Sequence, residues 1–235
     1  DSAFPTAVYF KEFKGYGDPN VYYYRKGSAA SMLRADEVLP QWFEGARHLH
    51  MTGITPALGE YTADAVRKAM EQAKAQGLTV SFDPNLRRKL WSEEKAREVL
   101  LPLNSLCDIF MPGLEEAEFL LGSHSEEEYG ALFRAMGPDV IVLKLGERGS
   151  VAYTGEGVVK ANPYKVERVV DTVGAGDAFA AGFLGSYLNG EDVLASLENA
   201  NLLGALATQY KGDWEGFPKQ EELQRLRKGG ASVTR

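Results

Sequence analysis

The sequence predicts an α/β fold, in which a parallel sheet flanked by helices is preceded by a β-hairpin. From Arg47 onward, short apolar runs alternate with longer amphipathic runs. Strand–helix repetition with short connections is typical of parallel sheets. Before this region, β-like runs at 7–13 and 20–25 enclose a segment rich in turn formers, which predicts a hairpin. The length of 235 residues suits one large α/β domain or a domain with a small appendage.

The elements after the hairpin follow from the same patterns, taken in chain order. We expect a strand at 48–51, a helix at 60–76, a strand at 78–82, a helix at 92–100, a strand at 108–111, helices at 114–121 and 125–136, and a strand at 140–143. Ser92 is the expected N-cap of its helix, since glutamates occupy the next two positions. Short β segments with glycine turns follow at 150–169, and helices at 175–189, 191–210 and near 219–228.

Composition excludes several functional classes. The formal net charge is -7, and nucleic-acid binding depends on clustered Lys and Arg, so no nucleic-acid partner is expected. One cysteine, Cys107, excludes an internal disulfide and a cysteine-based zinc site, and its apolar surroundings predict a buried, inert thiol. No apolar run reaches membrane-spanning length and no signal peptide opens the chain, so we expect a cytoplasmic protein without a membrane partner.

The densest functional signal is the stretch from Asp171 to Leu184. Gly174, Ala175 and Gly176 remove side-chain bulk at the start of a predicted helix. Unpaired backbone N–H groups and the helix dipole favour an anion at such a place. Asp177 follows at once and would supply a base for an attacking hydroxyl. An anion-binding turn and a base are two parts of a phosphoryl-transfer site.

Simpler interpretations of this stretch remain open on local sequence. A glycine-rich turn is often only a tight connection, and Asp177 can be an ordinary residue of a helix start. The stretch is not a dinucleotide-binding fingerprint, because Phe179 stands where the third glycine would be. It is not a P-loop either, since no Gly-Lys-Ser/Thr follows.

A second group of residues suits an organic acid that carries hydroxyls. Tyr23 and Arg25 point to one face of their predicted strand, where a ring can stack on a carbon chain and a guanidinium can bind a carboxylate. Arg87 belongs to the basic run 85–89, which follows the carboxyl end of a strand, where open parallel sheets bind ligands. The alternatives are a tyrosine-rich strand packed on a core and a solvated basic loop. His48 and His50 share a strand face, but a metal site would need a third ligand, and we find none.

The stretch Asp171–Leu184 resembles the C-terminal signature of the ribokinase-like (PfkB) sugar kinases. The similarity is greatest to the members that act on 2-keto-3-deoxygluconate and extends over most of the chain, through the segments 8–13, 22–29, 49–58, 83–87, 200–205 and 212–216. The resemblance implies Gly174, Ala175 and Gly176 as the anion hole, and Asp177 as the catalytic base.

The resemblance also implies the residues around each substrate. Those around the sugar acid are Tyr9, Tyr23, Arg25, Arg87 and, as a weaker candidate, Asp213. Those near the nucleotide are Asn85, Lys144, the turn Gly146–Gly149 and Asn201. Glu116 would help to organise the magnesium ion indirectly. Gly113 departs from the family pattern, which usually has Asn at this position.

The implied fold is a three-layer α/β/α sandwich with a small β-hairpin lid. Residues 1–34 would form the lid hairpin and its connection, and residues 35–235 the body that binds nucleotide and substrate. The chain starts at Asp1 without Met, and the N-terminal block of the family has no counterpart in it, so we expect that block to be missing. Lid hairpins often pair between subunits in this family, which implies a homo-oligomer.

Together with these residues, the resemblance implies an enzyme that uses ATP and Mg²⁺ to phosphorylate the terminal hydroxyl of a sugar acid. The preferred substrate is 2-keto-3-deoxygluconate, and the product is its 6-phosphate. One alternative keeps the family but takes a neutral sugar or a nucleoside. Another is a truncated, non-catalytic fragment that binds nucleotide only.

Overall fold

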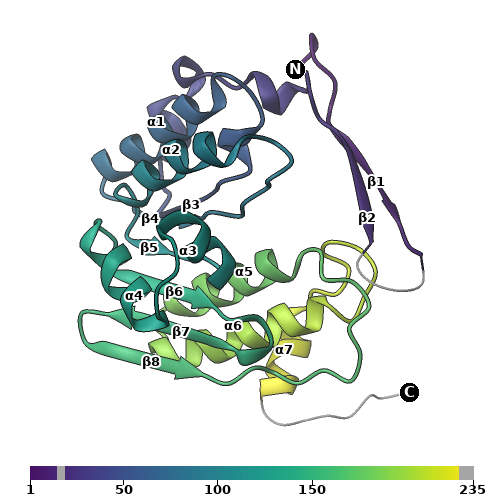
Figure 1. The fold of residues 1–235 in the computed structure, drawn as a ribbon, viewed down its shortest axis with the longest axis vertical. Coiled ribbons are helices and arrows are strands. Elements are labelled where there is room, and N and C mark those ends of the chain that lie inside the picture. The colour runs from purple at the N-terminus through teal and green to yellow at the C-terminus, as the bar shows by residue number, and fades with distance from the viewer. Residues whose placement is uncertain (15–18, 228–235) are drawn as a thin grey trace. The chain divides into compact units, whose positions relative to one another are not determined.

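The computed structural model describes residues 1–14 and 19–227. The predicted turn of the hairpin and the last residue of the predicted C-terminal helix lie outside them. The described chain forms two compact units (Figure 1). The first consists of residues 1–146 and 150–159, and the second of residues 147–149 and 160–235. The expected division into a lid and a body at residue 34 stays a prediction.

The elements correspond closely to the predicted ones. The strands are β1 (Val8–Glu12), β2 (Asn20–Tyr24), β3 (His48–Thr52), β4 (Thr79–Asp83), β5 (Ile109–Phe110), β6 (Val140–Lys144), β7 (Ser150–Thr154) and β8 (Gly157–Ala161). The α-helices are α1 (Thr62–Ala75), α2 (Glu93–Asn104), α3 (Leu114–Leu121), α4 (Glu126–Ala135), α5 (Ala175–Tyr187), α6 (Val193–Ala207) and α7 (Gln220–Arg227). Short 3-10 helices lie at Ala29–Met32, Ala35–Glu37, Pro40–Phe43, Thr55–Ala57 and Gly146–Arg148. None of the described helices is both long and apolar enough to span a bilayer.

The predicted hairpin is confirmed by the antiparallel pairing of β1 with β2. Tyr9 lies opposite Tyr23, and Val8 lies opposite Tyr24. The rings of Tyr9 and Tyr23 are 5.8 Å apart, as are those of Phe10 and Tyr24. Cross-strand aromatic pairs stabilise such ribbons, although a two-stranded hairpin alone is only marginally stable. The hairpin therefore presents an aromatic surface, since all these side chains are exposed.

The main sheet has the strand order β3-β4-β5-β6-β7-β8. Strands β3 to β6 pair in parallel, as expected from the strand–helix repetition. The sheet as a whole is mixed, because β7 runs antiparallel to β6. The connection between these two strands holds only a 3-10 helix, Gly146–Arg148. A parallel crossover would need a dozen or more residues.

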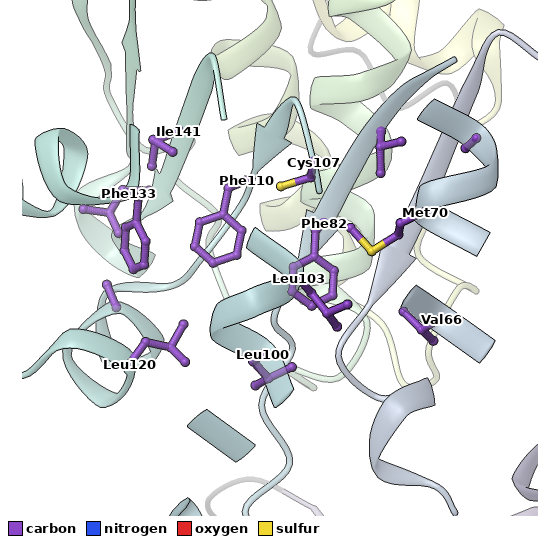
Figure 2. Packing of buried hydrophobic residues seen from close by; sticks show 14 of the residues in the cluster. Val66, Met70, Phe82, Leu100, Leu103, Cys107, Phe110, Leu120, Phe133 and Ile141 are labelled. Atoms are coloured by element: carbon purple, nitrogen blue, oxygen red, sulfur yellow. The ribbon is translucent and has the colours of Figure 1, made fainter. Parts of the chain in front are cut away.

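The core of the first unit lies between the sheet and helices α1 to α4 (Figure 2). Phe82 and Phe110 come from neighbouring strands, and Phe133 of α4 packs on Phe110 with ring centroids 4.8 Å apart. Cys107 is 3% exposed, and its thiol donates to Asn104 O at 3.2 Å. The predicted burial of this cysteine is confirmed. Burial raises the pKa of the thiol, which suits the expected inertness.

The second unit is built on the packing of α5 against α6, which lie side by side (Figure 1). A Cβ on Gly182 would lie 2.9 Å from Ala200 Cα, so the glycine permits the close approach of the two helices. Asn199 Nδ2 donates to Gly182 O at 3.1 Å and to Ser186 Oγ at 3.0 Å. This packing holds the N-terminus of α5, which carries the predicted anion hole.

His48 and His50 belong to a hydrogen-bonded network between β3 and β4. Both rings bond to Ser81 Oγ at 2.7 Å, and His48 also bonds to Thr79 Oγ1 at 2.7 Å. In the described part of the chain, no three His, Cys, Asp or Glu side chains form a group that could hold a metal ion. Burial and the neighbouring His50 lower the pKa of His48 from 6.5 to about 4, against the opposing effect of Asp108.

We expect this network to make stability depend on pH. Between pH 6.5 and about 4, the unfolded chain binds a proton at His48 that the folded chain does not bind. The free energy of unfolding should therefore fall as the pH is lowered through this window. Urea unfolding at pH 7 and pH 5 measures the change, and His48→Gln should reduce it. His124→Gln, at an exposed position, is the control. An unchanged pH dependence in His48→Gln would contradict the assignment.

Candidate active site

The turn before α5 has the geometry of an anion-binding site. Gly174, the N-cap residue of α5, has φ +86°, and a Cβ there would lie 2.0 Å from Asp213 O. A Cβ on Gly176 would meet nothing within 4 Å. The backbone of Asp213 therefore leaves no room for a side chain at Gly174, whereas the space beside Gly176 is free for a ligand atom. Ala175 N donates to Thr172 O at 3.3 Å. Because the first N–H groups of a helix lack intrahelical acceptors, the turn can present the amides of Gly174 and Gly176 to an anion.

Asp177 lies in the first turn of α5, and its side chain is exposed. A carboxylate here is close in sequence to the anion-binding amides and accessible to a ligand. Asp213 contacts the same turn through its backbone, beside Gly174. The roles of Asp177 as a base and of Gly174, Ala175 and Gly176 as an anion hole stay predictions, and this geometry suits them.

The first unit holds four of the predicted sugar-acid residues, Tyr9, Tyr23, Arg25 and Arg87, whereas Asp213 belongs to the second unit. Tyr9 faces Tyr23, and Arg25 Cζ lies 3.8 Å from the centroid of the Tyr23 ring. Burial lowers the pKa of Arg25, and the nearby Arg87 lowers it as well, against the opposing effect of Tyr23. Tyr9 is 44% exposed and Tyr23 is 42% exposed, so the alternative of a tyrosine-rich strand packed on a core is wrong.

Two predicted nucleotide residues meet at the carboxyl end of β4. Lys144 Nζ donates to Asp83 Oδ2 at 2.6 Å, and Asn85 N donates to Asp83 Oδ1 at 3.1 Å. Asp83 is 1% exposed, and Asn85 has φ +37°. Sequence reasoning gave Asp83 no role. Its place as a carboxylate at the end of a buried strand, just before a Pro-Asn turn, was the signal that could have found it.

The Glu116 side chain is hydrogen-bonded to two backbone segments of the first unit. Its Oε1 accepts from Leu86 N, and its Oε2 accepts from Gly113 N, both at 2.7 Å. The carboxylate thus joins the loop after β4 to the start of α3. Gly113 has φ -77°, which any residue can adopt, so no backbone strain requires glycine there.

Two of the remaining nucleotide candidates, Gly149 and Asn201, lie at the end of β8. Gly149 has φ +86°, and a Cβ there would lie 2.3 Å from Ala161 O. Asn201 Nδ2 donates to Asn162 O at 2.9 Å and to Ala161 O at 3.4 Å. Gly146, at the start of the same turn, has φ +61°. Gly149 and Asn201 therefore position one segment, Ala161–Asn162, within the second unit.

The sequence matches the description "pfkB family carbohydrate kinase" over residues 2–220. The chain belongs to this family of carbohydrate kinases. It is 39% identical over 220 residues to a 2-dehydro-3-deoxygluconokinase of Bacillus subtilis, covering 93% of this chain and 68% of the relative. It is 35% identical to a 2-dehydro-3-deoxygluconokinase of Thermoproteus tenax, covering 97% of this chain and 70% of the relative. A probable fructokinase-4 of Arabidopsis thaliana is 33% identical, and the match covers 97% of this chain and 72% of the relative.

Solved structures of pfkB kinases share the fold. A PfkB protein from Polaromonas sp. JS666 has a TM-score of 0.86 at 36% identity, covering 96% of this chain and 72% of that one. A putative ribokinase II from E. coli, in complex with ATP and Mg²⁺, has a TM-score of 0.83 at 30% identity, and the match covers 91% of this chain and 69% of that one. The ribokinase-like α/β fold expected of this pfkB kinase is therefore confirmed.

Proposed function

We propose that this pfkB kinase transfers the γ-phosphoryl group of ATP to the terminal hydroxyl of 2-keto-3-deoxygluconate, giving the 6-phosphate. The observation that carries the proposal is the pair of guanidinium groups of Arg25 and Arg87 in the first unit. The two relatives named as 2-dehydro-3-deoxygluconokinases support the same substrate. The E. coli neighbour in complex with ATP and Mg²⁺ supports the phosphoryl donor.

Two neighbouring cations suit an anionic ligand. Burial and the nearby Arg87 disfavour the charged form of Arg25, whereas Tyr23 favours it. Arg25 Nε is also buried, and within the described chain it has no hydrogen-bond acceptor. A substrate carboxylate would compensate both the repulsion and the missing hydrogen bond, because guanidinium groups bind carboxylates through paired N–H donors. A neutral sugar would leave the repulsion in place.

The aromatic pair next to these cations suits the rest of a sugar acid. Tyr9 and Tyr23 are both exposed on the hairpin, and the Arg25 guanidinium lies over the Tyr23 ring. Such rings can stack on the carbon chain of a hydroxylated acid while the guanidinium groups hold its carboxylate. Binding of this kind orients the substrate and fixes which hydroxyl reacts, without taking part in bond making.

Asp177 and the turn before α5 would carry out the chemistry. The Asp177 carboxylate takes the proton of the terminal hydroxyl, whose oxygen then forms a bond to the γ-phosphorus. The bond from the γ-phosphorus to its bridging oxygen breaks, and ADP leaves. The N–H groups of Gly174 to Gly176 stabilise the negative charge that develops on the phosphoryl oxygens.

The nucleotide would be bound by Asn85, Lys144, the turn Gly146–Gly149 and Asn201. Magnesium commonly takes one or two carboxylates together with phosphate oxygens and waters, so the ion would come with ATP. Glu116 uses both oxygens for backbone N–H groups, which suits an indirect contact through water. When bound, Mg²⁺ neutralises charge on the phosphates.

We also propose that two copies of the chain associate through the hairpin β1–β2. Its exposed aromatic side chains and its marginal stability as a lone pair of strands favour a partner. Sedimentation velocity should give twice the chain mass or more, and a single-chain mass would contradict the proposal.

Arg25→Ala tests the substrate. We expect the KM for 2-keto-3-deoxygluconate to rise roughly 10- to 100-fold, since a charged hydrogen bond is lost, while the KM for ATP stays unchanged. Any turnover of fructose should change far less. Initial rates of ADP release with both sugars measure the effect. Arg88→Ala is the control, because it also removes a guanidinium group, but Arg88 is exposed, follows Arg87 in the basic run 85–89 and pairs with Glu93.

The same assays distinguish the other candidate functions. The similarity to the Arabidopsis fructokinase favours a neutral-sugar kinase as the second candidate. An equal rise of KM for both sugars in Arg25→Ala, or a wild-type preference for fructose, would support that candidate against the proposal. Calorimetric binding of ATP without binding or turnover of the sugar acid would instead identify a non-catalytic nucleotide-binding fragment.

A further inference from the structure

Asp171 is a buried carboxylate where the segment before α5 meets the segment after α6. It is 1% exposed. Its Oδ1 accepts from Val173 N at 3.0 Å, and its Oδ2 accepts from Gly212 N at 3.2 Å. A single side chain therefore joins two backbone segments that are 41 positions apart in the sequence.

The same two segments are joined a second time through the backbone. Thr208 O accepts from Val170 N at 2.7 Å and from Asp171 N at 3.1 Å. Thr208 is the C-cap residue of α6, where the last carbonyl groups lack intrahelical donors. We call this set of residues the Asp171 clamp (Val170, Asp171, Val173, Thr208 and Gly212).

The clamp encloses the contact that shapes the anion-binding turn. Gly174 follows Val173 directly, and Asp213 follows Gly212 directly. A Cβ on Gly174 would lie 2.0 Å from Asp213 O, so the two backbones approach as closely as glycine permits. Gly212 itself has φ +121°, a conformation that glycine adopts readily. The direction of the amides from Gly174 to Gly176 therefore depends on how the two segments are held.

The chemistry of the clamp explains why a carboxylate occupies this position. The groups at Val173 and Gly212 that donate to Asp171 are backbone N–H groups. An ionised carboxylate only accepts hydrogen bonds, whereas an asparagine would place its own NH₂ against one of the two N–H groups. A buried negative charge is costly, and near an anion-binding turn it also opposes the ligand. The carboxylate at position 171 therefore indicates that the N–H groups of Val173 and Gly212 both require an acceptor.

We propose that Asp171 is a positioning residue for phosphoryl transfer. It locks residues 171–173 against residues 208–213 and so fixes the orientation of the amides at Gly174, Ala175 and Gly176. It acts through these amides and touches neither substrate. The inference rests on the proposed function, in that the turn before α5 binds the transferred phosphoryl group.

Asp171→Asn tests the proposal with two readouts. The kcat should fall about 10- to 100-fold, because a small misplacement of preorganised groups has effects of this size, while the KM values for sugar acid and ATP stay unchanged. Amide hydrogen exchange, followed by NMR, should accelerate at Gly212. Asp192→Asn is the matched control: Asp192 caps α6 in the same unit by accepting from Ala195 N at 2.8 Å, and its kcat should equal that of the wild type.

A wild-type kcat in Asp171→Asn, or unchanged exchange at Gly212, would overturn the proposal. If Asp171→Asn does not fold, native-state exchange of the wild type decides: Val173 and Gly212 should open together as urea is added, and separate opening would overturn the clamp. Failure of the proposed function is visible separately, since the wild type would then release no ADP with the sugar acid. The exchange results alone would then decide whether the clamp exists.

Discussion

Asp177→Asn should lower kcat about 10²- to 10⁴-fold, the range that a positioned general base contributes. An amide cannot take the proton of the attacking hydroxyl, but it has nearly the shape of the carboxylate. Binding of ATP and of the sugar acid should therefore remain. ADP release measures turnover, and isothermal titration calorimetry measures the two dissociation constants.

The control for this substitution is Asp64→Asn. Asp64 is also an exposed aspartate in the first turn of a helix, here α1, where it pairs with Arg67 at 3.2 Å. Both variants lose a carboxylate near the positive end of a helix dipole, at a cost of about 0.3–1 kcal/mol in stability. Only Asp177→Asn should lose turnover. A kcat within tenfold of wild type would rule out Asp177 as the base.

Alanine at the two glycines of the anion-binding turn should have opposite effects on stability. Gly174→Ala forces a Cβ into the left-handed region and against Asp213 O, so we expect a loss of about 2–4 kcal/mol in the free energy of unfolding. Gly176→Ala places its Cβ in open space inside α5, and alanine should stabilise the helix by up to about 1 kcal/mol. Urea unfolding measures both changes.

Activity separates the two glycines further. Gly174→Ala should lose most turnover, because the turn can no longer adopt its shape. Gly176→Ala should fold as well as the wild type, yet turn over more slowly, since its methyl group occupies the space where a phosphoryl oxygen would approach. Wild-type turnover in Gly176→Ala would place the anion elsewhere. Equal stability of the two variants would contradict the steric argument at Gly174.

The sequence predicted most elements because their signals are local. Ser92 was expected as an N-cap, and its side chain accepts from Lys95 N at 3.2 Å. The helix that it starts was predicted to end at 100 but continues through Pro102 to Asn104, because Leu103 and Asn104 are buried against the core. The 3-10 helices between residues 29 and 43 were not predicted, since three or four residues show no hydrophobic period.

The site was less predictable, because its contacts join distant parts of the chain. The resemblance pointed to Arg25 and Arg87 separately, but their mutual repulsion depends on the fold. The bond from Lys144 to Asp83 spans 61 positions, and no local pattern indicates it. Glu116 was expected near magnesium, whereas its two backbone hydrogen bonds with Leu86 and Gly113 became visible only in the structure.

The burial of Cys107 has a practical consequence for all these measurements. It is the one cysteine of the sequence, and in the folded chain its thiol is enclosed and resists ionisation. A thiol reagent can therefore modify Cys107 only after the core opens. The rate of labelling then reports how often the core opens, and no engineered cysteine is needed. Conversely, a cysteine introduced on the hairpin could carry a fluorophore with no background from the native thiol, which would allow motion of the aromatic strands to be followed during turnover.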